Sequence, residues 1–445
     1  MIWLKIFSCL VLIFSLAQFS AIGENFEISK RNLLAVEGLN GDARQKREVL
    51  AENDLVIEVL FIIDYALFQR FCIFDNRQKV DSIRSSFMKW NENNRDRAMQ
   101  MIKYHFANIA DGIDKKYRTI DDMKYKYSVR LIGYYICETA DSADFIEKLK
   151  SSDGKLKMTP AQASVADWVA NNLRTREKPN NKVPTSDMAV AFTGYDTGDI
   201  PGRAYIGTVC RTAGTALIQS KGLYDTIDTA AHEMGHILGS RHDGDRNNCT
   251  LDDLYLMGSN YFPWSAKNNY HTFSPCSRKY FQLLTDSIVG DNHNCLSRKN
   301  MYRKYEEIAT YLVDMPGTKY SPDVQCQMRY GMAFKYCTPG DKEHDSICSR
   351  MHCWNPQLNG CDHFGRAHDG TTCGDKMWCI RGQCVRDERA PSVKGTCIYG
   401  DAPNRFKSYE DNSMYTCKDV AKDRERMCRE SKDKCCITCQ GYGED

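Results

Sequence analysis

The segment from His232 to Asp243, His-Glu-Met-Gly-His-Ile-Leu-Gly-Ser-Arg-His-Asp, carries three histidines at spacings that suit one metal ion. On an α-helix His232 and His236 lie one turn apart on the same face, because they are four residues apart. Gly239 tolerates a positive φ, so the chain can leave the helix there and return His242 as a third nitrogen ligand. Three protein ligands leave a fourth coordination position open, which is typical of catalytic rather than structural zinc. The segment therefore predicts one catalytic Zn²⁺, bound by a helix and the sharp turn that follows it.

Glu233 directly follows the first predicted ligand, so its carboxylate can point toward a metal-bound water. A carboxylate placed there can take a proton from the water and pass a proton to a leaving group. Two histidines and a glutamate at this spacing could also arise by chance on an amphipathic helix, where both rings would be solvated. Gly239 and His242, both in register, favour the metal site over that alternative.

The 21 cysteines among 445 residues restrict the compartment, because disulfides persist in oxidising surroundings. Residues 1–23 resemble a secretory signal peptide: Lys5 precedes an apolar run, and Ala21-Ile22-Gly23 offers a small-residue cleavage site. A membrane anchor is the alternative, but the apolar run is shorter than the roughly 18 residues that a span requires. Cleavage there would leave an even number of cysteines. We expect a secreted protein without a membrane span, and a formal net charge of +2 gives no reason to expect nucleic acid.

Residues 24–47 are expected to form a short pro-segment that ends in a basic processing site, Arg44-Gln45-Lys46-Arg47. An exposed basic loop is the alternative interpretation. The segment contains no cysteine, so it cannot hold an enzyme latent by placing a thiolate on the zinc. The means of latency is left open.

Hydrophobic periodicity in residues 48–298 predicts one α/β catalytic unit that is long enough to bury a core. An edge segment that can pair with an extended peptide is expected at 202–210, although without the zinc motif beside it a purely structural strand fits equally well. Apolar, β-branched runs predict strands at 54–64, 127–137 and 187–194, and apolar residues at helical spacing predict helices at 81–117 and 160–172.

Cysteine density divides the remainder of the chain. Residues 299–324 are polar and predict a connector, residues 325–390 contain eight cysteines, and residues 391–445 contain six more. The last two segments have few apolar residues, so they depend on disulfides for stability. We expect two small disulfide-rich modules there.

The zinc motif, with Asp243 directly after the third histidine, resembles the reprolysin (adamalysin) branch of the metzincin metalloproteases over residues 55–298. The stretch that ends at Cys210 resembles the substrate-binding rim of that family. The resemblance implies a metzincin fold, with a mixed, mostly parallel twisted sheet, helices and a zinc cleft, and a Met-turn at Met257 beneath the metal. Family pairing implies the disulfides Cys210–Cys295 and Cys249–Cys276, which leaves Cys72 and Cys137 for each other.

This family commonly has a calcium site away from the zinc. Glu58 matches one of its ligands, but the position that should hold Asn or Asp is Arg298. Because a cation cannot ligate Ca²⁺, we expect this site to be lost and Arg298 to pair with Glu58 instead.

The stretch 369–374 and the pair Trp378-Cys379 resemble the cysteine-rich region of ADAMTS-type proteases, and residues 397–439 more loosely resemble the six-cysteine PLAC module. This layout is most similar to the salivary metalloproteases of ticks. The resemblance implies a secreted, monomeric zinc metalloendopeptidase that cleaves matrix or clotting proteins such as fibrinogen or fibronectin, as a salivary anti-haemostatic factor. The alternative is a non-proteolytic protein whose cysteine-rich modules bind receptors or matrix.

Two further expectations concern the surface. Asn248 begins an Asn-Cys-Thr sequon and is a candidate glycosylation site. Four histidines outside the zinc motif are expected to be exposed: His271, His293, His352 and His363.

Overall fold

The computed structural model describes residues 53–80, 92–173, 186–220, 226–258, 268–290, 294–297, 308, 312, 315–331, 333–337, 347–392, 406–408, 413–432, 434–435, 438–439 and 441–442. The expected signal peptide and the pro-segment, with its processing residues Arg44, Lys46 and Arg47, lie outside this set.

The catalytic part of the chain folds around one five-stranded sheet in the order β2-β1-β3-β5-β4. Four strands are parallel, and only β4, at one edge, runs antiparallel to its neighbour. The predicted fold class, a mixed and mostly parallel sheet with helices, is confirmed. The strands are β1 (Asp54–Ile63), β2 (Lys126–Ile136), β3 (Met188–Thr193), β4 (Gly202–Ala204) and β5 (Thr215–Gln219).

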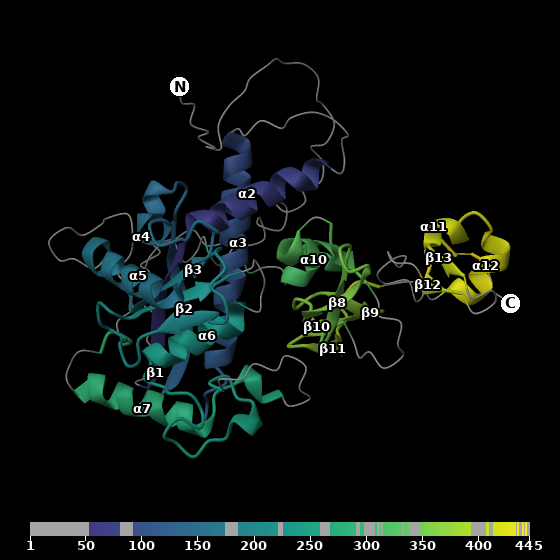
Figure 1. Ribbon diagram of the computed structural model, residues 1–445. Helices are drawn as coiled ribbons and strands as arrows, with labels where there is room; N and C mark the ends of the chain where they lie inside the picture. The colour runs from purple at the N-terminus through teal and green to yellow at the C-terminus, as the bar shows by residue number, and fades with distance from the viewer. Residues whose placement is uncertain are drawn as a thin grey trace, which may run out of the picture.

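Helices lie on both faces of this sheet (Figure 1). Because successive side chains of a strand point to opposite faces, β1 contributes Phe61 to one core and Ile62 to the other. Helices α2, α3 and α6 pack on the Phe61 face, and α4 and α5 pack on the Ile62 face. The helices are α2 (Tyr65–Val80), α3 (Glu92–Tyr117), α4 (Asp144–Glu147), α5 (Met158–Asn172), α6 (Thr226–Ile237) and α7 (Pro275–Gly290), with short 3-10 turns at η2 (Asp141–Ala143), η3 (Leu251–Asp253) and η4 (Asn268–His271).

The three predicted strands and the predicted helix at 160–172 are confirmed within two residues at each end. The helix predicted at 81–117 is confirmed from Glu92 onward, and residues 81–91 lie outside the described set. Helix α2 is not among the predicted elements. It begins directly after β1 because Asp64 caps it: the Leu67 amide donates a hydrogen bond of 2.8 Å to Asp64 Oδ1.

The predicted disulfide between Cys72 and Cys137 is wrong, because both residues are buried cysteine thiols in the structure. Cys72 on α2 packs into the core on the Phe61 face, whereas Cys137, just after β2, packs into the core on the Ile62 face. The sheet separates the two side chains, and pairing by elimination cannot reveal this. The other two predicted disulfides, Cys210–Cys295 and Cys249–Cys276, are confirmed.

A cysteine-rich unit follows, built on two antiparallel three-stranded sheets, β6-β7-β8 and β11-β10-β9. Its elements are α9 (Pro316–Lys319), α10 (Pro322–Tyr330), β6 (Lys335–Tyr336), β7 (Met351–Asn355), β8 (Gly360–Gly365), β9 (Thr372–Gly374), β10 (Met377–Ile380) and β11 (Gln383–Arg386). Four disulfides link them: Cys326–Cys353, Cys337–Cys361, Cys348–Cys379 and Cys373–Cys384. Helix α10 spans the boundary that the sequence predicts between residues 324 and 325.

His352 is not at the surface as expected. It is 6% exposed, because it lies on β7, the central strand of its sheet. His271 and His363 are partly exposed, and His293 lies outside the described residues.

The cysteine-rich unit packs beside α3 of the catalytic part (Figure 1). The rings of Tyr104 on α3 and Tyr320 are 6.0 Å apart, and His271 Nε2 lies 3.1 Å from the Arg381 carbonyl oxygen. The two parts therefore share an interface with both aromatic and polar contacts.

A small third unit contains β12 (Phe406–Lys407), β13 (Met414–Tyr415), α11 (Cys417–Val420) and α12 (Arg424–Ser431). Two disulfides, Cys417–Cys435 and Cys428–Cys439, form much of its core. The remaining two cysteines of this segment, Cys397 and Cys436, lie outside the described residues.

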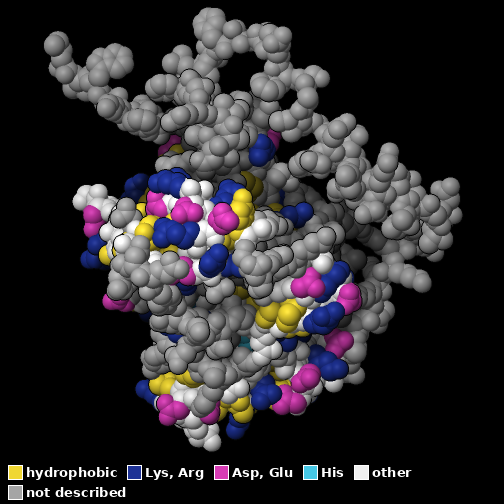
Figure 2. Space-filling model, turned by 90° about the vertical axis from the view of Figure 1, so that its right-hand side faces the viewer, with side chains coloured by type: hydrophobic (Ala, Val, Ile, Leu, Met, Phe, Trp, Pro, Cys, Tyr) yellow, Lys and Arg dark blue, Asp and Glu magenta, His cyan; other side chains and the backbone are white. Residues whose placement is uncertain are grey.

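Two observations concern the surface. Among the described residues, no helix is both long and apolar enough to cross a membrane. On the described part of the face in Figure 2, basic and acidic side chains are interspersed, so this face offers no broad patch of one charge.

Candidate metal centre

Helix α6 (Thr226–Ile237) carries the first two predicted ligands and lies between α3 and the β4 edge of the sheet. Its alanines and methionine are good helix formers, and Asp228 in the first turn suits the positive end of the helix dipole. Tyr117 of α3 is fully buried and donates a 3.0 Å hydrogen bond to the Ala231 carbonyl. The helix is therefore fixed from its middle against α3.

The three predicted ligands converge. His242 Nε2 lies 3.0 Å from His232 Nε2 and 3.2 Å from His236 Nε2, and the three ligand atoms all lie within 4.8 Å of one another. Two nitrogens that bind one tetrahedral Zn²⁺ at about 2.0–2.1 Å are themselves about 3.3 Å apart. The arrangement thus fits a single zinc ion.

Backbone carbonyls orient two of the rings from behind. His232 Nδ1 is 2.7 Å from the Leu256 carbonyl oxygen, and His236 Nδ1 is 2.8 Å from that of Ser240. If each Nδ1 carries the proton and donates it, both Nε2 atoms keep a lone pair for the metal. Burial lowers the pKa of His232 to about 3 and that of His236 to about 4. The rings are therefore neutral, which is the form that binds zinc.

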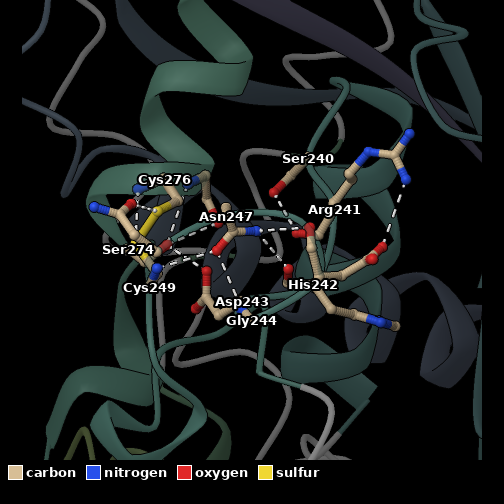
Figure 3. Close-up of a disulfide and its surroundings, with 12 residues drawn as sticks. Ser240, Arg241, His242, Asp243, Gly244, Asn247, Cys249, Ser274 and Cys276 are labelled. Atoms are coloured by element: carbon tan, nitrogen blue, oxygen red, sulfur yellow. Dashed lines mark hydrogen bonds and ion pairs between the residues drawn. A yellow bond between two sulfur atoms is a disulfide. The ribbon is translucent and has the colours of Figure 1, made fainter.

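The turn after α6 delivers His242. Gly239 has a φ of +97°, as the sequence predicts, and the next residues leave the helix. The Asn247 side chain donates a 2.8 Å hydrogen bond to the His242 carbonyl, and Ser274 Oγ donates one of 2.6 Å to the buried carboxylate of Asp243 (Figure 3). The Cys249–Cys276 disulfide lies directly beside these contacts. Asp243 thus ties the third ligand to the start of α7.

Met257 is fully buried and packs against the zinc-binding helix, where the resemblance implies a Met-turn. Its carbonyl accepts a 3.0 Å hydrogen bond from the Asp243 amide. A Cβ added at Gly235 would lie 2.7 Å from Met257 Sδ. A glycine in the middle of a helix costs about 1 kcal/mol relative to alanine. The close approach of Met257 explains why α6 nevertheless has a glycine at position 235.

Glu233 is 6% exposed and lies against the edge strand. A Cβ added at Gly202 would be 2.7 Å from Glu233 Oε1 and 2.8 Å from its Cγ. Burial raises the pKa of Glu233 to about 8, and the nearby charge of Arg203 opposes that shift. Gly202 therefore leaves the space that the candidate base occupies.

We expect a Gly202→Ala variant to keep its zinc and lose peptidase activity, because the added methyl group displaces the Glu233 side chain. A misplacement of about 1 Å can cost about 100-fold in rate. Bound zinc and kcat measured on one preparation test this. Gly290→Ala is the matched control, because a Cβ there meets nothing within 4 Å. Equal activity in the Gly202 and Gly290 variants would contradict the assigned role.

The segment after β4 also closes the end of the zinc helix. The Gly207 amide donates to the His236 carbonyl at 2.9 Å, and the amides of Thr208 and Val209 donate to Ile237 at 3.0 and 3.1 Å. These bonds satisfy carbonyls that a helix C-terminus leaves without intrahelical partners. Of the predicted edge segment 202–210, residues 202–204 form the edge strand β4, and the residues that follow cap the zinc-binding helix.

The structure leaves several sequence predictions untested. Asn248 is exposed, so a glycan could attach there, and its glycosylation stays a prediction. Glu58 is buried and its amide donates to Asp187 Oδ2 at 2.8 Å, but Arg298 lies outside the described residues. The loss of the calcium site therefore also stays a prediction. The site roles of Gly202 and Gly235 are not predicted from the sequence, since their contacts are long-range or depend on packing.

Comparison with known proteins agrees with this geometry. Residues 143–243 match the family model of reprolysin-like metallo-peptidases of family M12B, and residues 316–385 match that of ADAMTS cysteine-rich domain 2. Together, the fold, the three-histidine group and the matched model identify a reprolysin-like catalytic domain with a candidate zinc site, followed by an ADAMTS-type cysteine-rich domain. The disulfides and this likeness indicate an extracellular protein.

The similar curated proteins are named as metalloproteinases with thrombospondin motifs. The chain is 24% identical over 314 residues to a Bombyx mori protein named "a disintegrin and metalloproteinase with thrombospondin motifs like", an alignment that covers 64% of this chain and 41% of that one. It is 31% identical over 213 residues to human "a disintegrin and metalloproteinase with thrombospondin motifs 1", covering 45% and 20%. The chain thus spans less than half the length of these relatives.

Proposed function

We propose that this protein is a secreted zinc-dependent metalloendopeptidase that hydrolyses peptide bonds of extracellular proteins. The observation that carries the proposal is the convergence of three imidazoles beside one buried carboxylate, at the edge of a sheet. A structural zinc site would more commonly have four protein ligands and would need no such carboxylate.

The zinc ligands, Glu233 and the edge strand would have different roles in the reaction. When bound, Zn²⁺ supplies Lewis acidity, which polarises the scissile carbonyl and makes a water molecule more acidic. His232, His236 and His242 would hold the ion. Glu233 takes a proton from the attacking water on its carboxylate and then donates a proton to the leaving nitrogen. The edge strand β4 can hold the substrate backbone by main-chain hydrogen bonds, which keeps the scissile bond in place.

We propose matrix and clotting proteins, such as fibrinogen and fibronectin, as substrates, and an anti-haemostatic role in saliva. Support for this finer proposal comes from the disulfide-rich, extracellular character of the chain and from the resemblance of its layout to tick salivary metalloproteases. The protein is expected to act as a monomer without nucleic-acid partners.

Removal of zinc tests the proposal. The secreted protein is incubated with fibrinogen, fibronectin and gelatin, with and without a zinc chelator, and zinc is then added back. We expect cleavage to stop on chelation and to return with stoichiometric zinc, because the three histidines release the ion to a stronger ligand and can bind it again. Cleavage products are followed by electrophoresis and mass spectrometry.

Two outcomes would count against the proposal. Undiminished cleavage after zinc is removed would place the activity elsewhere. No cleavage by the processed, zinc-loaded protein would favour the alternative in which the cysteine-rich modules bind receptors or matrix.

A further inference from the structure

We propose that Arg203 on the edge strand selects substrates with an acidic side chain next to the residue that faces the zinc. The inference rests on the proposed peptidase function and extends it to specificity. It starts from three properties of Arg203 that the structure brings together: its place on β4, its exposure and the absence of an ion pair with any described residue.

The register of β4 decides which way Arg203 points. Gly202 and Ala204 pair with Ile218 and Ala216, which belong to the core on the α6 face, whereas Arg203 pairs with Leu217, which belongs to the core on the opposite face. Directly paired residues in antiparallel strands share a face. Arg203 therefore lies on the face away from the zinc helix, and its two neighbours lie on the face toward it.

A bound peptide would continue this alternation. A peptide that adds to β4 as the next strand places one side chain beside Arg203, and the residues on either side of that position point toward α6 and the zinc. The residue beside Arg203 is thus directly adjacent in sequence to one that enters the zinc side of the cleft.

Arg203 is available for such a contact. Its side chain is exposed, and it makes no ion pair with any residue that the structure describes. Many other basic side chains of the catalytic part are paired, for example Arg118 with Asp114 and Lys148 with Asp144. The residue before Arg203, Gly202, lies directly against Glu233, because a Cβ added at Gly202 would be 2.7 Å from Glu233 Oε1. A positive charge thus stands at the rim, close to the position of the scissile bond.

Two large apolar side chains are exposed in the rim beside Arg203. Tyr205 and Ile206 are 38% and 48% exposed, and both follow directly in the segment that caps α6. The rim would therefore favour peptides that combine one acidic side chain with apolar neighbours. Asp and Glu are the side chains that match an exposed guanidinium.

A peptide series tests the inference. One cleavable peptide is varied to Glu, Gln or Lys at each position that flanks the cut, and kcat/KM is measured for wild type and for Arg203→Met and Arg203→Glu. An exposed charge pair contributes up to about fivefold. We expect one position at which wild type prefers Glu to Gln by about that factor. Arg203→Met should lose this preference, and Arg203→Glu should prefer Lys there instead.

Controls separate this result from general effects. Lys126→Met removes the same charge from β2, at the opposite edge of the sheet, and should keep the preference for Glu. In wild type the preference should weaken as salt is raised, because exposed charge pairs are screened. Bound zinc shows that each variant is folded at the site.

The outcomes are distinguishable. If wild type cleaves no peptide, the proposed function fails. If wild type cleaves peptides but shows no preference for Glu at any position, or if Arg203→Met keeps that preference, the function stands and the assignment of Arg203 is overturned.

Discussion

Replacing Glu233 by glutamine is expected to lower kcat by about 100- to 10,000-fold, which is the usual contribution of a general acid-base group. Glutamine has nearly the same shape, so the space beside Gly202 stays filled, but it cannot accept the proton of the attacking water. The rings of His232 and His236 are held by the Leu256 and Ser240 carbonyls and not by Glu233, so bound zinc should be unchanged. Kinetics and metal content on one preparation check both statements.

Glu147→Gln is the matched control. Glu147 is also largely buried, with a side chain that is 9% exposed, but it contacts Lys150 and Tyr195. That variant should keep its kcat. If Glu233→Gln kept full activity with zinc bound, another residue would have to be the base. Loss of cleavage in Glu233→Gln would also exclude a contaminating protease as the source of the activity.

The second large effect is on stability. Lys116 of α3 and Asp228 of α6 form an ion pair of 2.7 Å, with side chains only 7% and 14% exposed. Burial by itself raises the pKa of Asp228, but the charges of Lys116 and Arg366 outweigh this and bring it below its usual value. Arg366 belongs to the cysteine-rich unit, so this carboxylate of α6 interacts with both α3 and the cysteine-rich unit.

Asp228→Asn should destabilise the catalytic part, because it leaves the buried Lys116 ammonium without its carboxylate. Removal of one partner of a buried pair costs about 3–5 kcal/mol. A loss of about 3 kcal/mol lowers the thermal midpoint of a domain of this size by about 6–12 °C. The midpoint is measured by differential scanning calorimetry on the disulfide-intact protein.

Asp144→Asn provides the comparison, since Asp144 also lies in the first turn of a helix and also pairs with a lysine, Lys148. That pair is exposed, with side chains 73% and 43% accessible, and exposed pairs contribute at most about 1 kcal/mol. A midpoint shift no larger for Asp228→Asn than for Asp144→Asn would show that burial of the Lys116 pair contributes little.

Local spacing predicted the metal centre because its geometry is local. His232 and His236 are brought together by one helical turn, and Gly239 and His242 follow within the next turn of chain. The strands β1, β2 and β3 could also be predicted from the sequence, since buried parallel strands are continuous apolar runs. Helix α2 could not be predicted, because its sequence has little amphipathic pattern and its start depends on a cap by Asp64.

Only some of the cysteine pairs could be predicted from the sequence. The pairs Cys210–Cys295 and Cys249–Cys276 followed from a family resemblance, and they hold. The pairing of Cys72 with Cys137 followed only from counting, and it fails because the two residues lie on opposite faces of the sheet. An even number of cysteines carries no information about faces.

The sequence by itself determined the candidate ligands, the candidate base and the class of fold, because each depends on residue type and on spacing within a few turns of chain. Only the tertiary structure decided which distant residues meet: Gly202 with Glu233 and Lys116 with Asp228. Only the strand register decided that Arg203 faces away from the zinc helix while staying at the rim. Such contacts join residues 31 to 112 positions apart, and the sheet and helix packing that creates them leaves no local pattern in the sequence.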